Sequence, residues 1–331
     1  GDALRVPGAL RRTGTGSVNL ARFPFPLTAD VYRYSTNVEP ARVFTETATG
    51  GWGDRVIDVD EHYRPELALR SRILARDPSR CTVLPHMRPA AWDALILILH
   101  ELVVSCPEHM ELRRDGSRWH WKNGLLGVEQ SFVFGDEASL PCDPLTFAGG
   151  QAQEDLVLLD QREGTLWADA GLVTFAADWS LNFVIGMPFL EIHGPVPRIR
   201  EERVITRAEQ FLLRLQAGAD YRRTNWSMTV DRRLDTSTEN SPEWARERRL
   251  AVAAGQQDRL HLRVEVQHLI RLAGSGAILF LIRTYLAPLT EVARIPQWRH
   301  RFGRVLAELP QDMAEYKGLV RYRELVAVMF D

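Results

Sequence analysis

The sequence predicts an α+β fold built on an antiparallel sheet. Helix-forming segments come first, a run of strands joined by short turns follows, and helical segments return at the C-terminal end. Strands that follow one another through tight turns pair antiparallel, because parallel pairing needs a crossover of a dozen or more residues. The apolar content of 45% and the charged content of 25% are typical of a globular protein rather than a disordered one.

We expect the chain of 331 residues to form a single domain. Residues 1–115 are predicted to be an N-terminal wrap with helices, residues 116–290 to hold the sheet, and residues 291–331 to be helical. Within the wrap, Phe23-Pro24-Phe25-Pro26 is predicted to be an extended apolar tether, since each proline biases the residue before it away from helix.

Two helices are predicted before the sheet. The first opens near Pro65, since proline is tolerated in the first helical turn, and reaches about Ala75. The second runs from Pro89 to about Cys106, and its apolar side chains recur at helical spacing. That stripe consists of Trp92, Leu95, Leu99 and Leu102.

Alternating and apolar runs then predict an antiparallel meander. Trp119-His120-Trp121 alternates and leads into the turn signal Asn123-Gly124. The apolar run 156–159 turns at Glu163-Gly164 into further strand-forming segments that extend to Phe175.

A helix, three strands and a helical tail complete the predicted fold. Thr206-Arg207-Ala208-Glu209 has the pattern of a capping box, and Gly218 is the expected C-cap. The polar stretch between Arg232 and Gln257 is long enough to be a mobile loop. The other elements are strands over 221–230, 261–272 and 277–286 and helices over 296–330.

Composition excludes several classes of function. The formal net charge of −2 predicts no nucleic-acid partner, since proteins that bind polyanions carry a positive excess. The longest apolar run, 94–99, is much shorter than the roughly 20 residues of a membrane span, and no signal-like apolar core opens the sequence. We therefore expect a cytoplasmic protein without a membrane partner.

The sequence contains none of the common cofactor motifs. No dinucleotide GxGxxG, Walker A lysine loop, HExxH or GxSxG pattern occurs. Cys81, Cys106 and Cys142 are far apart, which argues against an iron–sulfur cluster, a c-type haem attachment or a disulfide framework. Any redox centre must be held by isolated residues, and neither flavin nor an iron–sulfur cluster is expected in this chain.

His193 is a candidate metal ligand. It lies in Ile192-His193-Gly194-Pro195-Val196-Pro197, where the two prolines fix the path of the chain after it. A rigidly held imidazole suits an axial ligand, which needs a fixed ring orientation. The alternative is a histidine that caps a helix end.

Three charged residues stand beside or inside apolar strands. Glu154 and Asp155 precede the apolar run 156–159 on opposite faces, so one of them could bind an amine or relay protons. Arg283 interrupts a second apolar strand and needs a partner, either one of these carboxylates or a carboxylate of a cofactor. The alternatives are a capping role or a structural ion pair.

The segment 221–226 is the fourth candidate. As a strand it places Tyr221, Arg223 and Asn225 on one face and Arg222, Thr224 and Trp226 on the other. Asn225 could donate a hydrogen bond to a bound ligand. The alternative is an ordinary amphipathic strand.

Taken in order, these segments resemble the haem-dependent oxidative N-demethylases. This family contains proteins like the α-subunit of dimethylamine monooxygenase, and it was formerly classified as a domain of unknown function. The likeness covers roughly residues 20–320, and its most specific parts are His-x-Pro-Val-Pro and Ile-Arg-Thr-Tyr. The matching pieces are Phe23-Pro24-Phe25-Pro26, Ile57 to Tyr63 with Arg70, Gln153 to Leu156, Ala170-Gly171 with Trp179, Ile192 to Pro197, Asn225-Trp226, Gly276 to Tyr285 and Tyr316-Lys317-Gly318.

The resemblance implies a PAS-like haem fold that holds haem b. It implies a monooxygenase that uses O2 to oxidise a methylated amine and releases formaldehyde, with electrons from a separate flavin/iron–sulfur reductase that uses NADPH. It makes His193 the expected axial ligand of the haem iron. The expected cofactor-binding residues are His193, Arg223, Trp226 and Arg283, and the candidate catalytic residues are Asn225, Glu154, Asp155 and Tyr285. A homodimer remains an open alternative.

Two departures from the family pattern leave other functions open. A Cys-Phe-Pro-Ser-like run is replaced by residues 174–179, and Val184 stands where the family tends to have a basic residue. One alternative is a haem enzyme of secondary metabolism that oxidises a different nitrogen-containing or aromatic substrate. The other is a PAS domain that senses haem or a gas.

Overall fold

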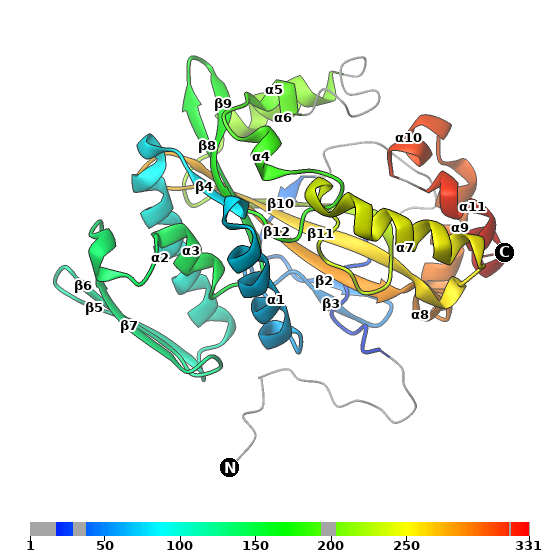
Figure 1. The fold of residues 1–331 in the computed structure, drawn as a ribbon, viewed down its shortest axis with the longest axis horizontal. Coiled ribbons are helices and arrows are strands. Elements are labelled where there is room, and N and C mark those ends of the chain that lie inside the picture. The colour runs from blue at the N-terminus through cyan, green and yellow to red at the C-terminus, as the bar shows by residue number, and fades with distance from the viewer. Residues whose placement is uncertain (1–17, 29–37, 193–202, 318, 331) are drawn as a thin grey trace, which may run out of the picture.

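The computed structural model describes residues 18–28, 38–192, 203–317 and 319–330 (Figure 1). The predicted α+β class is confirmed, since helices surround a seven-stranded sheet in which every pair of neighbouring strands is antiparallel. Its spatial order is β1-β10-β11-β12-β8-β9-β4. These strands are β1 (Glu39–Pro40), β4 (Cys81–Val83), β8 (Asp155–Arg162), β9 (Thr165–Leu172), β10 (Tyr221–Val230), β11 (Leu260–Arg271) and β12 (Ile278–Pro288).

The three strands predicted after residue 220 agree with β10, β11 and β12 to within two residues at each end. The long hairpin of β11 and β12 crosses the middle of the molecule (Figure 1). Its turn needs a glycine at position 276, where φ is +77°. Both edge strands, β1 and β4, come from the predicted N-terminal wrap, which therefore forms part of the sheet.

The predicted meander is divided between two sheets, which corrects the sequence-based expectation. Strands β5 (Met110–Asp115), β6 (Arg118–Asn123) and β7 (Val128–Val133) form a separate three-stranded sheet, whereas β8 and β9 join the central one. Helix α3 (Pro144–Gly149) interrupts the run, because Asp143 caps it by accepting hydrogen bonds from the first backbone N–H groups.

Helices α1 (Tyr63–Arg76) and α2 (Arg88–Ser105) confirm the two predicted N-terminal helices. All four residues of the predicted α2 stripe are buried. Helix α2 packs between the two sheets, in one apolar cluster with Phe132 of β7 and Leu279 of β12. The remaining paired strands are β2 (Thr45–Thr47) and β3 (Gly50–Trp52).

The segment predicted as a mobile loop contains helix α7 (Ser241–Ala253). Pro242 lies in its first turn, and Trp244 and Ala251 are buried. The indole N–H of Trp244 also donates to the carbonyl of Ser237. The polar composition of this helix reflects its exposed side, which is why its pattern resembled a loop.

The helices between β9 and β10 are α4 (Leu181–Val184), α5 (Phe189–Ile192) and α6 (Val204–Leu213). Helix α6 begins before the predicted capping box, so Thr206 lies inside it and is not its N-cap. Gly218 has a φ of +85° but lies beyond the C-cap, which is Arg214. Burial of Val204 and Ile205 accounts for the earlier start.

The C-terminal segment is helical, as predicted, and consists mainly of α8 (Leu289–Ala293), α9 (Pro296–Glu308), α10 (Gln311–Tyr316) and α11 (Arg323–Phe330). The predicted tether packs against it, since the ring of Phe25 stacks on that of Trp298 at a centroid distance of 4.7 Å. No helix in the described part of the chain has the length and apolar content needed to cross a bilayer.

The central sheet has two differently covered faces. Leu269, Ile278 and Val157 pack with residues of α4, α5 and α6, and we call this side the α6 face. Leu156 and Leu279 project to the other side and pack with α2, so we call it the α2 face. At the far end of the α2 face, Trp226 and Val264 pack with α8, α9 and α11.

Candidate functional site

A group of neighbouring polar side chains lies on the α6 face of β10 and β11. It consists of Arg223, Asn225, Arg263, Glu265, Gln267 and Lys317, and we call it the polar network. Arg223 donates from Nη1 to Oε1 of Gln267 at 2.8 Å, and Gln267 donates from Nε2 to Oε2 of Glu265 at 3.1 Å. Arg263 Nη2 lies 3.5 Å from Oε1 of Glu265.

The strand register explains why these residues meet. Arg223 pairs with Gln267 across the ladder, and Asn225 pairs with Glu265. Paired residues project to the same face, and every second residue along each strand does the same. The network therefore follows from the alternation of side chains along β10, which places Arg223 and Asn225 on the same face as Tyr221.

Lys317, which follows α10, joins the network from the C-terminal segment. Its Nζ donates to Asn225 Oδ1 at 3.3 Å and to the carbonyl of Trp226 at 2.8 Å, and it lies 4.6 Å from the centre of the Trp226 ring. Burial lowers the pKa of this ammonium to about 7, the charge of Arg223 lowers it too, and Glu265 opposes the shift. The positive charge of the network therefore decreases as pH rises through about 7.

We expect Lys317 to titrate near pH 7 in the folded protein, because its half-buried ammonium lies beside a second cation. The chain contains only one other lysine, the exposed Lys122. Reductive methylation with ¹³C-formaldehyde would thus give two lysine NMR signals, and Lys317→Arg would identify the one of interest. If both signals titrate only above about pH 9, the enclosed position of Lys317 is incorrect.

Four other predicted residues lie on the opposite face of the sheet. Trp226 packs with the C-terminal helices. Tyr285 donates from its hydroxyl to Asp58 Oδ2 at 2.7 Å. Arg283 Nη2 lies 2.7 Å from Asp60 Oδ2, and Glu154 Oε2 accepts from the Asp58 backbone N–H at 3.1 Å. The sheet separates Tyr285, Arg283 and Glu154 from the polar network, whereas Lys317 contacts both Asn225 and the ring of Trp226.

Glu154 is buried in this second group. Burial raises the pKa of its carboxyl to about 7, against the opposing charge of Arg283. Its Oε1 has no hydrogen-bond partner among the described residues. Arg283 lies at ion-pair distance from the carboxylates of Asp60 and Glu66, although its Nε and Nη2 make no hydrogen bond with the described residues. This arrangement favours the structural ion pair that the sequence left as an alternative.

Asp155 projects to the side opposite Glu154, as alternation predicted, and its partner is Arg70 of α1. Oδ1 of Asp155 accepts from Arg70 Nη2 at 2.7 Å, and the backbone N–H groups of Thr174 and Phe175 also donate to this carboxylate. Burial raises the pKa of the Asp155 carboxyl, and Arg70 opposes that shift. The arrangement has the form of a buried structural ion pair.

His193 lies outside the described residues. Of the candidate residues predicted from the sequence, Arg223 and Asn225 lie in the polar network, whereas Arg263, Glu265, Gln267 and Lys317 were not predicted as site residues. Three of them had a signal, since Arg263, Glu265 and Gln267 alternate with the apolar residues Leu262, Val264 and Val266. Lys317 lies in Tyr316-Lys317-Gly318, one of the segments that carry the family resemblance, but the sequence did not place it beside the sheet, because it comes from a distant part of the chain.

Two hollows lie elsewhere in the described part of the molecule. Neither is lined by a residue predicted to bind the cofactor or to act in catalysis. The larger, of about 670 Å³, lies between α2, the three-stranded sheet and the β11–β12 turn, and Ile96, Trp119 and Phe134 line it. The smaller, of about 20 Å³, lies beside α7 and includes Asp178 and Trp244. The chemistry of the polar network, rather than the size of a hollow, makes the α6 face the candidate site.

The fold and the network define an α+β protein with a charged site on one face of an antiparallel sheet. The family model described as haem-dependent oxidative N-demethylase, alpha subunit-like, matches residues 48–327. The chain belongs to this family of haem-dependent oxidoreductases, which confirms the resemblance seen in the sequence. The words "alpha subunit" in the family description indicate an enzyme of more than one subunit.

Proposed function

We propose that this chain is the haem-binding subunit of a monooxygenase that removes an N-methyl group from an amine as formaldehyde. The observation that carries the proposal is the family match over residues 48–327, most of the chain. In the overall reaction, a methylated amine, O2, NADPH and a proton yield the demethylated amine, formaldehyde, water and NADP⁺. A separate flavin/iron–sulfur reductase would deliver the electrons, in line with the absence of nucleotide and cysteine-cluster motifs from the sequence.

The α6 face fits a haem in its chemistry. Haem is a flat apolar ring with two carboxylates, and it needs an apolar surface beside cationic donors. Phe280 and Ile282 of β12 are half-buried on this face, next to the residues of β11 that carry the network. Arg223 and Lys317 provide the cations, and arginine binds carboxylates in bidentate fashion. A PAS-like core is supported by the antiparallel strands β8 to β12 with α4, α5 and α6 over one face.

In the proposed enzyme, His193 would bind the iron of haem b, and Arg223 and Lys317 would hold the propionates. The haem, when bound, supplies the activation of O2 and the oxidation of the methyl group. Glu265 is the acidic residue of the network and is the proposed counter-charge for a cationic amine. Asn225 accepts from Lys317 with Oδ1, so its amide nitrogen is the atom that would donate to a bound ligand. The hydroxymethyl amine that results from oxidation then collapses to the amine and formaldehyde.

The decisive experiment has two readouts on the purified chain loaded with haem. We expect a Soret band from the loaded protein alone. With the reductase, NADPH and methylated amines of increasing size, we expect one formaldehyde for each NADPH consumed. Failure to form a stable haem complex would contradict the proposal, and NADPH consumption that depends on substrate would exclude the gas-sensing alternative.

A second candidate function is oxidation of a different nitrogen-containing or aromatic substrate. Val184 favours it, because this last residue of α4 is buried in an apolar cluster with residues of α5 and α6, and the family tends to have a basic side chain at this position. A Soret band without formaldehyde from any methylated amine would favour this second function over the first.

A further inference from the structure

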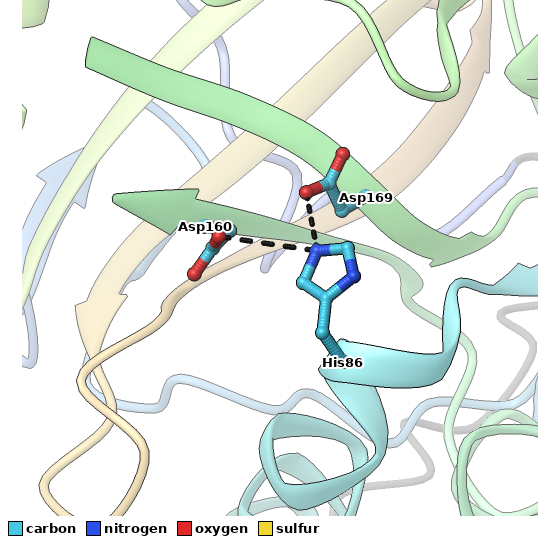
Figure 2. Close-up of side chains that lie close together, drawn as sticks. All are labelled: His86, Asp160 and Asp169. Carbon is cyan, nitrogen blue, oxygen red and sulfur yellow. Dashed lines mark hydrogen bonds and ion pairs between the residues drawn. The ribbon is translucent and has the colours of Figure 1, made fainter. Parts of the chain in front are cut away.

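A second cluster of ligating side chains lies on the α2 face, away from the polar network. It consists of His86 in the short 3-10 helix η2 (Pro85–Met87), Asp160 of β8 and Asp169 of β9, and we call it the His86 cluster (Figure 2). Nε2 of His86 lies 2.7 Å from Asp169 Oδ2 and 3.9 Å from Asp160 Oδ2. One ligand atom from each residue lies within 4.8 Å of the other two.

A β-bulge places the Asp169 carboxylate in this cluster. Leu158 pairs with Ala170 and Leu159 with Ala168, so Asp169 is the extra residue that the ladder leaves unpaired. Bulges redirect a side chain, and they occur often beside functional sites. Leu159 and Ala168 pack on the α6 face, whereas Asp169 projects toward His86 on the other side.

Asp169 has an unsatisfied acceptor in a buried position. Its side chain is 0% exposed, and its Oδ1 has no hydrogen-bond partner in the part of the chain that the structure describes. The other oxygen, Oδ2, lies beside His86 and Arg162 and faces the cluster, whereas Oδ1 is directed away from His86 (Figure 2). A cation in the cluster would therefore stabilise this buried charge through Oδ2.

Arg162 now supplies the positive charge. Its Nη1 donates to Asp160 Oδ2 at 2.7 Å and also to Asp169 Oδ2. The side chain is 38% exposed, and its guanidinium lies 4.5 Å from the centre of the Trp167 ring. Arg162 can therefore withdraw from the carboxylates without leaving a buried charge behind, because water and the indole face are available to it.

We propose that His86, Asp160 and Asp169 form a binding site for a divalent metal ion of the zinc type, which competes with Arg162 for the two carboxylates. One imidazole nitrogen and two carboxylate oxygens are zinc ligands, whereas magnesium and calcium prefer sites made of oxygen alone. Such an ion would clamp the β8–β9 hairpin to the segment before α2. The site lies on the other face of the sheet from the proposed haem, so it does not depend on the proposed function.

The test is calorimetric titration of the metal-free protein with ZnCl₂. Because Arg162 is the competitor, Arg162→Ala should bind one Zn²⁺ about tenfold or more tightly than the unmodified chain, as expected for removal of a charge-assisted contact. His86→Ala should abolish this binding event, and His86→Ala combined with Arg162→Ala should not recover it. His100→Ala removes another exposed histidine and should leave the event unchanged.

Two results would overturn the proposal. One is an affinity of Arg162→Ala no higher than that of the unmodified chain, and the other is an event that survives His86→Ala. In either case Arg162 is the permanent counter-charge and the cluster is a salt bridge. His86 and Arg162 are both partly exposed, and thermal unfolding of each variant checks that the fold is retained. Substitution of Co²⁺ for Zn²⁺ gives a second readout, a visible absorption band that His86→Ala should remove.

Discussion

Replacing Arg70 with methionine is expected to lower the free energy of unfolding by about 3–5 kcal/mol, the range for removing one partner of a buried ion pair. The Arg70 side chain is 1% exposed, and it binds Asp155, Thr174 Oγ1 and the carbonyl oxygens of Gly149, Ala152 and Gln153. Methionine fills much of the same volume but donates no hydrogen bond. The Asp155 carboxylate would then be buried without its counter-charge, and three carbonyls would lose a donor.

Urea denaturation measures this effect as a shift of the midpoint at a constant slope. Arg72→Met is the matched control, because Arg72 lies on the same helix but is exposed, and we expect its effect to stay within about 0.5 kcal/mol. If the two variants lose the same stability, the ion pair does not hold α1 against the start of β8.

The second large effect is expected for His193→Ala in the haem-loaded protein. Loss of the proposed axial ligand should shift the Soret band and weaken retention of haem during gel filtration. His193→Gly should allow external imidazole to enter the vacated position and restore the original spectrum. This rescue separates a lost ligand from a damaged fold, since imidazole does not repair misfolding.

His268→Gln is the control for this assignment. His268 is 3% exposed on the α2 face of β11, and neither ring nitrogen has a hydrogen-bond partner among the described residues. Burial lowers the pKa of this imidazole to about 3, with Arg222 and Arg42 acting in the same direction, so it is neutral and able to bind a metal. A Soret band that changes in His268→Gln but not in His193→Ala would show that the ligand had been assigned to the wrong histidine.

Local patterns predicted most of the secondary structure. Strands β10, β11 and β12 and helices α1 and α2 have boundaries within two or three residues of the expected ones. Their apolar periodicity is a property of a few neighbouring residues, so it can be seen without the fold. The incorrect predictions for α7 and for the start of α6 have a common cause. Both depend on the burial of Trp244, Val204 and Ile205 against distant segments.

The candidate site was predicted only in part, for the same reason. Alternation along β10 placed Arg223 and Asn225 on one face and Trp226 on the other, which the register bears out. It could not place Arg283, Tyr285 or Glu154 relative to them, because that depends on which strands pair. The structure puts Asp58 and Asp60 beside these three residues, so their closest partners come from the N-terminal segment.

By itself, the sequence determined the α+β class, the family and the candidate residues, because these rest on periodicity and on short motifs read along the chain. Only the tertiary structure decided which residues share a face. It separated the polar network from the buried group around Arg283, and it brought Lys317 to Asn225 from 92 positions away. The physical reason is that strand register and helix docking join residues far apart in the chain, and these contacts form only when the whole apolar core is buried.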